Sequence, residues 1–217
     1  AITEDTDLSS SSKMDVEAVA TAALPAMVQL NGTTTVKSSS YFGYGQSYEA
    51  TSSGTGIIVG KSDTELLIVT NAHVVDNIDN LKCVFSDGTS ASCSVKGSKS
   101  DQDIAVAAVS LSDISSDTAS NIAIAELEDS SDIKVGQQVV AIGNALGEGQ
   151  SVTTGIISAK DRSITVNNVT FTGLLMTDAA INSGNSGGAL LNSEGKVIAI
   201  NFAKTSSDGV EGMAYSI

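Results

Sequence analysis

Aromatic residues, proline and histidine are scarce in this sequence. Only 4% of its 217 residues are aromatic and none is tryptophan, although 41% are hydrophobic, so a core must consist of Val, Ile, Leu and Ala. A single proline, Pro25, stands against 20 glycines. Many glycines indicate many tight turns, which favours short β-strands over long helices. We therefore expect an all-β fold.

Basic residues are also few. Eleven Lys and Arg residues oppose 25 Asp and Glu residues, which gives a formal net charge of −14. Such a chain repels polyanions, so the composition argues against a nucleic-acid-binding protein and against a protein of anionic membrane surfaces. No apolar run approaches the ~20 residues of a membrane-spanning helix, and no signal peptide opens the sequence. If the protein is exported, we expect that segment to lie outside this sequence.

The beginning of the chain is polar. Residues 1–13, AITEDTDLSSSSK, are predicted to form a disordered leader or linker. Residues 15–24 carry apolar side chains at helical spacing after serines that can cap a helix, which predicts a short helix ending near Pro25. Residues 31–53 are rich in Thr, Ser, Gly and Tyr, and we expect a flexible surface loop there.

Short apolar stretches follow, each with the length of a β-strand, and the acidic, serine-rich stretch 110–132 divides them into two groups. About six strands in each group, joined by glycine-rich turns, predict a pair of small antiparallel barrels. We expect one domain, 14–217, with the first barrel in 14–119 and the second in 120–217. The predicted strands are 54–59, 66–70, 81–85, 92–95 and 104–109, and then 138–143, 152–159, 170–177, 188–191, 196–202 and 212–217.

The two cysteines, Cys83 and Cys93, flank a predicted hairpin turn at 86–89, SDGT. A two-residue loop would place Cys83 opposite Ser92. A three-residue loop or a bulge would place it opposite Cys93, close enough to bridge. We expect the disulfide, which would indicate an oxidising compartment; two half-buried thiols are the alternative.

The segment 182–188, NSGNSGG, frames a serine with glycines. A nucleophilic serine in an acyl-transfer enzyme needs backbone N–H groups aimed at the developing oxyanion. Gly184 can adopt backbone angles that turn its N–H toward the same point as that of Ser186, while Gly187 and Gly188 keep side chains away. The pattern predicts Ser186 as nucleophile and the N–H groups of Gly184 and Ser186 as oxyanion hole. A simple turn is the alternative, because Gly- and Ser-rich loops are common.

The only histidine, His73, follows an apolar strand in a short polar break. Functional groups are often carried at such places, and an imidazole can take the serine proton and return it to the leaving amine. An aspartate must then hold the imidazole in the right tautomer. Asp103 leads directly into an apolar strand and can be partly buried, but on the residues alone Asp101 and Asp178 remain alternatives.

Six segments resemble successive landmarks of HtrA/DegP-family protease domains, in that family's order. They run from residue 54 to the end, and the early helix with ALPAMVQL resembles the family's start; only the leader and 31–53 have no match. The most specific landmark is TDAAINSGNSGGALLN, in which Ser183 stands where the family commonly has proline. The others are SGTGIIV, LLIVTNAHVVDN, DQDIAVAAV, VGQQVVAIGNALGEGQSVTTGIISA and EGMAYSI.

The resemblance implies a chymotrypsin-like double six-stranded antiparallel β-barrel with a short N-terminal helix. It places the family's histidine on His73, its aspartate on Asp103 and its nucleophile on Ser186, and gives Asp178 no place in the triad. It implies a serine endopeptidase that degrades unfolded or damaged polypeptides through an acyl-enzyme, with no metal or organic cofactor. It also implies a homotrimeric full-length protein outside the bacterial cytoplasm, with a membrane anchor and PDZ modules outside this sequence.

The absence of certain residues limits which side chain the enzyme can prefer before the cleaved bond. Chymotrypsin-like enzymes that cleave after Arg or Lys generally carry an acid six residues before the serine, where this chain has Ala180. Relatives that cleave after Glu generally use a pocket histidine, and His73 is already assigned. We expect a small apolar pocket that favours Val, Ala or Leu at P1, the residue before the cleaved bond. Its lining is drawn from Ala180, Ile181, Ile200 and Phe202.

The backbone of the serine loop offers a means of regulation. A flipped peptide around residues 184–185 would aim a carbonyl instead of an N–H at the substrate. We expect mobile polar loops at 160–172 and 203–211 to support this loop, and the protease domain by itself to be a weak protease. Two alternatives to a protease remain: an inactive relative that binds unfolded chains as a chaperone, and a Ser/Thr-rich surface adhesin.

Overall fold

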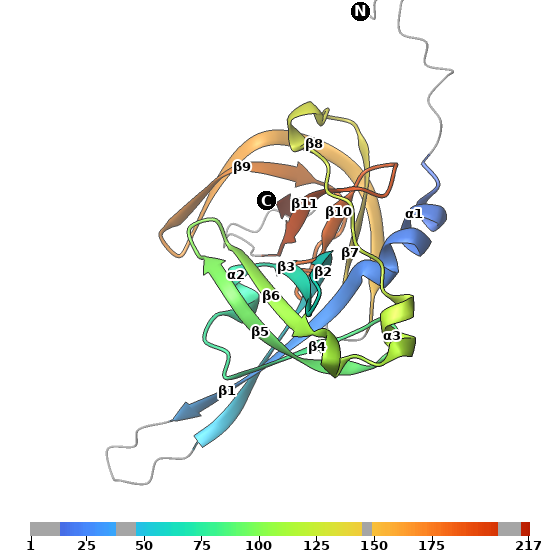
Figure 1. The fold of residues 1–217 in the computed structure, drawn as a ribbon. Coiled ribbons are helices and arrows are strands. Elements are labelled where there is room, and N and C mark those ends of the chain that lie inside the picture. The colour runs from blue at the N-terminus through green and yellow to red at the C-terminus, as the bar shows by residue number, and fades with distance from the viewer. Residues whose placement is uncertain (1–13, 38–46, 145–148, 204–213) are drawn as a thin grey trace, which may run out of the picture.

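The computed structural model describes residues 14–37, 47–144, 149–203 and 214–217, so the predicted leader lies outside the described residues. Two closed antiparallel barrels of six strands each lie side by side (Figure 1). The predicted all-β, chymotrypsin-like double barrel with a short N-terminal helix is therefore confirmed.

The first barrel closes in the order β1-β2-β3-β6-β5-β4. Alternating apolar residues turn one face of each strand inward; along β3, for example, Leu66 and Ile68 are buried and their neighbours are half-buried. The buried residues form one core cluster that includes Val28, Leu30 and Ile58. The strands are β1 (Met27–Lys37), β2 (Ser47–Lys61), β3 (Glu65–Thr70), β4 (Asn80–Val84), β5 (Ser90–Lys99) and β6 (Ile104–Ser110).

The predicted surface loop at 31–53 is wrong for the part that the structure describes. Strands β1 and β2 continue through it as a long ribbon that extends away from the barrel in Figure 1, paired from Met27↔Ile57 out to Lys37↔Ser47. Threonine is β-branched and suits an extended backbone, so a polar strand forms where no core demands apolar residues. The remaining residues of the predicted loop, 38–46, lie outside the described residues.

The second barrel closes in the order β10-β11-β12-β9-β8-β7. The polar segment 160–172, predicted as a loop, is instead the paired end of the β8–β9 hairpin. Its turn is formed by Asn167 and Asn168, whose φ angles of 51° and 64° are tolerated by asparagine. The strands are β7 (Gln138–Gly143), β8 (Ser151–Val166), β9 (Val169–Thr177), β10 (Ala189–Leu191), β11 (Val197–Phe202) and β12 (Ala214–Ser216).

The predicted N-terminal helix is present as α1 (Val16–Ala23), followed by the 3₁₀ turn η1 (Leu24–Ala26). Its cap is Asp15 rather than a preceding serine: the Asp15 carboxylate accepts the Ala18 N–H at 3.0 Å. The helix packs in one cluster with residues of β2, β7, β10 and β11, so it lies at the junction of the barrels. No helix within the described ranges is long and apolar enough to cross a membrane.

The segment between the barrels, predicted as a connection, contains three short helices: η2 (Leu111–Asp113), α3 (Ser116–Asn121) and η3 (Ser130–Asp132). Two of them begin with a serine cap. Ser110 accepts the Ser112 N–H and Ser115 accepts the Thr118 N–H. The high serine content of this segment therefore reflects helix caps as well as exposure.

The predicted disulfide is wrong, because Cys83 and Cys93 are free thiols. The β4–β5 register pairs Cys83 with Ala91 and Cys93 with Leu81. The two cysteines are thus diagonal neighbours on the inner face, and such positions are about 7–8 Å apart, too far for a bridge without backbone movement. The cysteines therefore do not indicate an oxidising compartment.

Candidate active site

His73 lies on α2 (Ala72–Val75), the short helix that follows the end of β3. Its neighbours Ala72, Val74 and Val75 are buried in the core of the first barrel, whereas the His73 side chain keeps 24% of its surface exposed. The apolar flanks of the histidine therefore anchor a helix that presents one imidazole outward.

Asp103 is the partner of His73. Its carboxylate accepts the His73 backbone N–H on Oδ1 at 2.9 Å, and its Oδ2 lies 2.6 Å from His73 Nδ1. The residue is 2% exposed and has a φ of 52° at the turn before β6 (Ile104–Ser110). A carboxylate accepts hydrogen bonds, so this contact favours a proton on Nδ1, and Nε2 is then the acceptor whenever the ring carries one proton. This is the tautomer that a general base needs.

Asn71 holds the turn of Asp103 from behind. This fully buried side chain donates from Nδ2 to the Asp103 carbonyl at 3.0 Å, and the Ala72 N–H donates to the same carbonyl at 3.1 Å. Two donors on the carbonyl and two contacts on the carboxylate fix both ends of Asp103. The left-handed backbone of this aspartate is thus supported by its surroundings.

Ser186 lies in the loop before β10, at the contact between the barrels. The Ala203 N–H donates to Ser186 Oγ at 3.2 Å. The ring of the preceding Phe202 meets the His73 ring edge-on, with centroids 6.2 Å apart and planes at 87°. Phe202 at the end of β11 therefore contacts His73, and Ala203, which follows it, contacts Ser186. The hydroxyl proton of Ser186 is not used by the Ala203 contact.

The two alternative aspartates lie elsewhere. The Asp101 side chain is 71% exposed, and its carboxylate lies 3.9 Å from Lys99 Nζ. The Asp178 carboxylate accepts the Ile156 N–H at 2.7 Å and so ties β8 to the segment before the serine loop. The geometry therefore favours Asp103 as the partner of His73.

Alternate backbone N–H groups of the serine loop donate hydrogen bonds within the described residues. The Asn185 N–H donates to the Asn182 carbonyl, and the Asn185 carbonyl accepts the Gly188 N–H, each at 2.9 Å. The Gly187 N–H donates to the Asn201 carbonyl at 3.0 Å. Within the described residues, the N–H groups of Gly184 and Ser186 have no acceptor. These are the two donors expected to form the oxyanion hole.

Glycine is required at two positions of this loop by close contacts. Gly187 has a φ of 82°, and a Cβ there would collide with the Thr55 carbonyl and the Thr70 hydroxyl. At Gly188, a Cβ would collide with the Ile142 carbonyl of β7. The glycines after the serine therefore allow the loop to approach both barrels.

Several polar residues that hold the loop were not singled out from the sequence. Asn185 is 2% exposed; its Oδ1 accepts from the Ser151 hydroxyl at 3.2 Å. Thr153 of β8 donates to the Ala180 carbonyl at 2.9 Å. Thr55, inside the SGTGIIV landmark, contacts the loop from the first barrel. A signal was present for Thr55 alone, as a polar residue between two glycines at the start of an apolar run.

The four residues predicted for a substrate pocket pack in different places. Ala180 is exposed, and the half-buried Ile181 packs on the core of the second barrel. Ile200 packs with the cluster that contains α1, and Phe202 is 2% exposed in a separate cluster. Ala180 and Ile181 therefore remain candidates for the pocket wall, while Ile200 and Phe202 have other packing partners.

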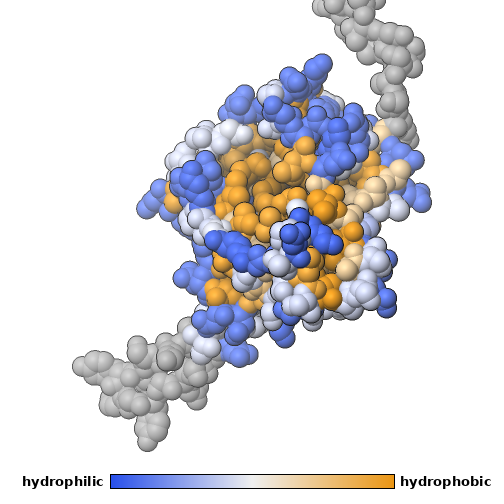
Figure 2. Space-filling model, viewed as in Figure 1, coloured by the Kyte–Doolittle hydropathy of each residue, from blue (hydrophilic) through white to orange (hydrophobic). Residues whose placement is uncertain are grey.

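Apolar residues are exposed on one face of the molecule and also surround Phe202 in its interior. Figure 2 shows apolar residues gathered at the centre of the face seen in Figure 1, inside a hydrophilic rim. Inside the second barrel, Phe202 packs in a buried cluster with Phe171 and Leu174, against half-buried Ile164, Val166, Tyr215 and Ile217. The side of His73 that meets Phe202 thus rests on a buried apolar surface.

Metal chemistry finds no support in the part of the chain that the structure describes, where no group of three or more His, Cys, Asp or Glu residues could hold an ion. The expectation of a cofactor-free reaction stays a prediction.

Comparison with known proteins gives a consistent result. A model of the trypsin-like peptidase domain matches residues 54–200. Serine protease Do-like HtrA of Bacillus subtilis (strain 168) is 38% identical over 202 residues, 89% of this chain and 43% of that protein. Periplasmic serine endoprotease DegP of Escherichia coli (strain K12) is 39% identical over 167 residues, 77% of this chain and 33% of that protein. The solved structure of the HtrA-type protease AlgW with tripeptide matches with a TM-score of 0.74 and 32% identity, over 93% of this chain and 59% of that chain.

The chain belongs to the trypsin-like peptidase family, whose members are serine peptidases. Within that family it is a protease domain of the HtrA/DegP type, as its sequence landmarks predicted. It spans less than half the length of the two curated relatives described above.

Proposed function

We propose that this chain is an endopeptidase that cleaves polypeptides through an acyl-enzyme on Ser186. His73 Nε2 takes the Ser186 proton as Oγ attacks the scissile carbonyl, and His73 then gives the proton to the leaving amine. Asp103 holds the imidazole and stabilises its protonated form. The N–H groups of Gly184 and Ser186 bind the oxyanion of the tetrahedral intermediate.

One observation carries the proposal: the 2.6 Å contact between His73 Nδ1 and the buried Asp103 carboxylate. The Asp103 carboxylate is held from a second direction by the His73 backbone N–H, so it favours one tautomer only. The two loop N–H groups without an acceptor in the described residues support the oxyanion hole. An inactive chaperone relative would not need this arrangement.

The substrates we propose are unfolded or damaged polypeptides outside the bacterial cytoplasm. The relatives named periplasmic endoproteases support the class and the location. Ala180 in place of an acid, and the assignment of the only histidine to the triad, support an aliphatic P1 residue such as Val, Ala or Leu. A trimeric full-length protein with an anchor and PDZ modules stays part of this proposal by analogy with the family.

A fluorophosphonate probe tests the proposal directly, because it forms a bond only with a serine oxygen that a general base activates. We expect the probe to label the wild-type chain on Ser186 and to leave Ser186→Ala unlabelled. Hydrolysis of β-casein by the two proteins is compared in parallel. An unlabelled, inert wild-type chain that still binds unfolded casein would favour the chaperone alternative.

A further inference from the structure

Thr55 of β2 joins the first barrel to the serine loop of the second. On one edge of β2, Thr55 pairs with Gln29 of β1. On the other edge, the pairing with β3 begins only at Ile57↔Val69, so no strand occupies that side of Thr55. There the Thr55 N–H donates to the Ser186 carbonyl at 2.9 Å, and the Thr55 carbonyl accepts from the Thr70 hydroxyl at 2.7 Å.

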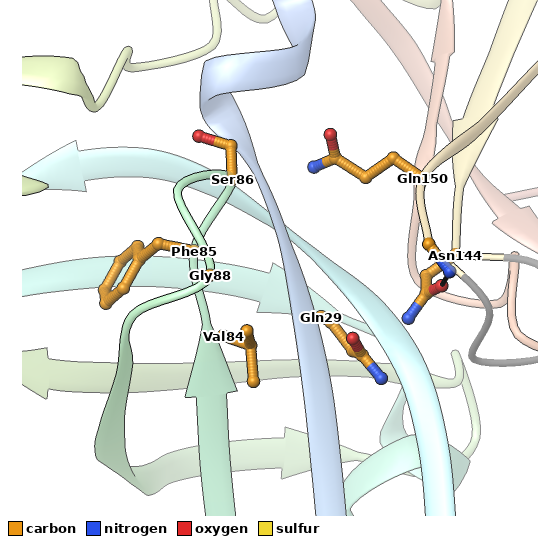
Figure 3. A pocket seen from close by; sticks show the side chains of 8 residues that line it. Gln29, Val84, Phe85, Ser86, Gly88, Asn144 and Gln150 are labelled. Carbon is orange, nitrogen blue, oxygen red and sulfur yellow. Dashed lines mark hydrogen bonds between the residues drawn. The ribbon is translucent and has the colours of Figure 1, made fainter.

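The Thr55 side chain makes two more connections, although it is only 1% exposed. Its hydroxyl donates to the Gly184 carbonyl at 2.8 Å and accepts the Asn144 backbone N–H at 2.8 Å. Asn144 follows β7, and its own Oδ1 accepts the Gly149 N–H at 2.8 Å beside a pocket of about 230 Å³ between the barrels (Figure 3). One hydroxyl therefore joins β2, the serine loop and the β7–β8 connection.

We propose that Thr55 is a positioning residue for the oxyanion hole, an inference that rests on the proposed function. In a trans peptide unit the C=O and N–H point in opposite directions. In the unit between Gly184 and Asn185, Thr55 holds the C=O and the Asn182 carbonyl holds the N–H. This unit lies between the two oxyanion donors and shares a Cα atom with each peptide unit that carries one, so holding its plane restricts where both donors can lie.

Gly184 makes the hydroxyl necessary. Its φ is 95° and it has no side chain to pack, so the backbone on either side of it rotates easily. Without the Thr55 hydroxyl, the Gly184 carbonyl loses its partner, and the oxyanion donors on either side of this peptide unit lose the restraint that it supplies. Donors of an oxyanion hole are effective because they are oriented before the reaction begins, so a loss of orientation lowers the rate of the chemical step.

Thr55→Val tests the inference, because valine keeps the shape of threonine and lacks the hydroxyl. We expect kcat on a fluorogenic peptide with Val at P1 to fall by about 10- to 100-fold, less than the 10²–10³-fold reported for loss of a donor itself. KM should stay within about twofold, because an interaction made only in the transition state is lost. A peptide boronate, whose oxygen occupies the oxyanion hole, should bind more weakly by the same factor as kcat falls.

Two further variants separate positioning from stability. Thr55→Ser keeps the hydroxyl and should restore most of kcat. Thr118→Val removes a hydroxyl from another buried threonine, one that contacts Ser115 and Thr89 in the first barrel, and should leave kcat unchanged. All rates are measured well below each thermal midpoint. If Thr55→Val does not fold, Thr55→Ser and Thr55→Cys, with a weaker donor, should still rank in kcat by donor strength.

The outcomes are distinct. An inert wild-type chain would overturn the proposed function and this inference with it. An active wild type with kcat and boronate affinity unchanged in Thr55→Val would overturn the inference alone. So would a Thr55→Ser variant as impaired as Thr55→Val, because the hydroxyl would then not be the relevant group.

Discussion

Asp103→Asn is the most informative single change, because the surrounding contacts dictate how the new amide must lie. The backbone N–H of His73 can only donate, and it now donates to Asp103 Oδ1 at 2.9 Å. An asparagine at this position must keep its oxygen there, so its NH₂ group replaces Oδ2 beside His73 Nδ1. Two donors cannot face each other, so Nδ1 gives up its proton and Nε2 becomes protonated.

This reversed tautomer leaves Ser186 without a base. In an analogous triad the same substitution lowers kcat by about 10⁴-fold, which corresponds to about 5.5 kcal/mol of transition-state stabilisation. We expect a loss of this size here. The fold should survive, because asparagine tolerates the 52° φ of this position and keeps the bond to the His73 N–H.

The assay is kcat/KM on the fluorogenic P1-Val peptide, with the rate of fluorophosphonate labelling as a second measure of base catalysis. Asp101→Asn changes an exposed side chain and Asp178→Asn keeps an acceptor for the Ile156 N–H, so both controls should lose far less activity. A large loss in either control, with Asp103→Asn near wild type, would refute the reasoning.

Four further outcomes are expected. Ser186→Ala should abolish β-casein hydrolysis and leave the thermal midpoint near wild type; substantial cleavage by the purified variant would show that another residue is the nucleophile. Gly184→Ala should lose most activity because its φ of 95° strains any side chain, which peptide hydrolysis and circular dichroism together can check. Titration with a thiol reagent after unfolding should find two free thiols per chain, whereas none would indicate the disulfide. Burial raises the pKa of Cys93 to about 11 and raises that of Cys83 further above its ordinary value. Above pH about 9 the unfolded chain therefore loses thiol protons that the folded chain keeps, so the free energy of unfolding should fall as the pH rises. The decline in thermal midpoint at high pH should therefore be shallower in Cys83→Ala, and equal slopes would contradict this.

The hydrogen bonds of the serine loop indicate which of its peptide units is free to turn. The unit between Gly184 and Asn185 is held at both ends, as described above. The preceding unit, between Ser183 and Gly184, has no partner among the described residues at either its carbonyl or its N–H. If the loop switches, we expect this preceding unit to turn. The supports predicted at 160–172 belong to a hairpin instead, and 204–211 lie outside the described residues.

The sequence by itself determined the class of fold and the candidates for the reactive residues. Short apolar stretches separated by glycines predicted strands, and β7 (Gln138–Gly143) has the predicted bounds. His73, as the only histidine, and Ser186, between glycines, could be selected as candidates from the residues alone, whereas the resemblance to HtrA/DegP proteases was needed to prefer Asp103 over Asp101 and Asp178. Patterns of this kind depend on residues that are close in the sequence, so they can be recognised without the tertiary structure.

Only the tertiary structure decided what depends on register and on contacts between distant segments. Cys83 and Cys93 are ten positions apart, but a shift of two residues in strand pairing separates them. Residues 31–37 lack apolar alternation, so their strand became visible only through pairing with β2. Thr55 stands between two glycines in the sequence, but its role became visible only when Gly184, 129 positions away, was found against its hydroxyl. Sequence patterns record which face of a strand is buried; which buried polar atoms meet is settled by how the two barrels pack.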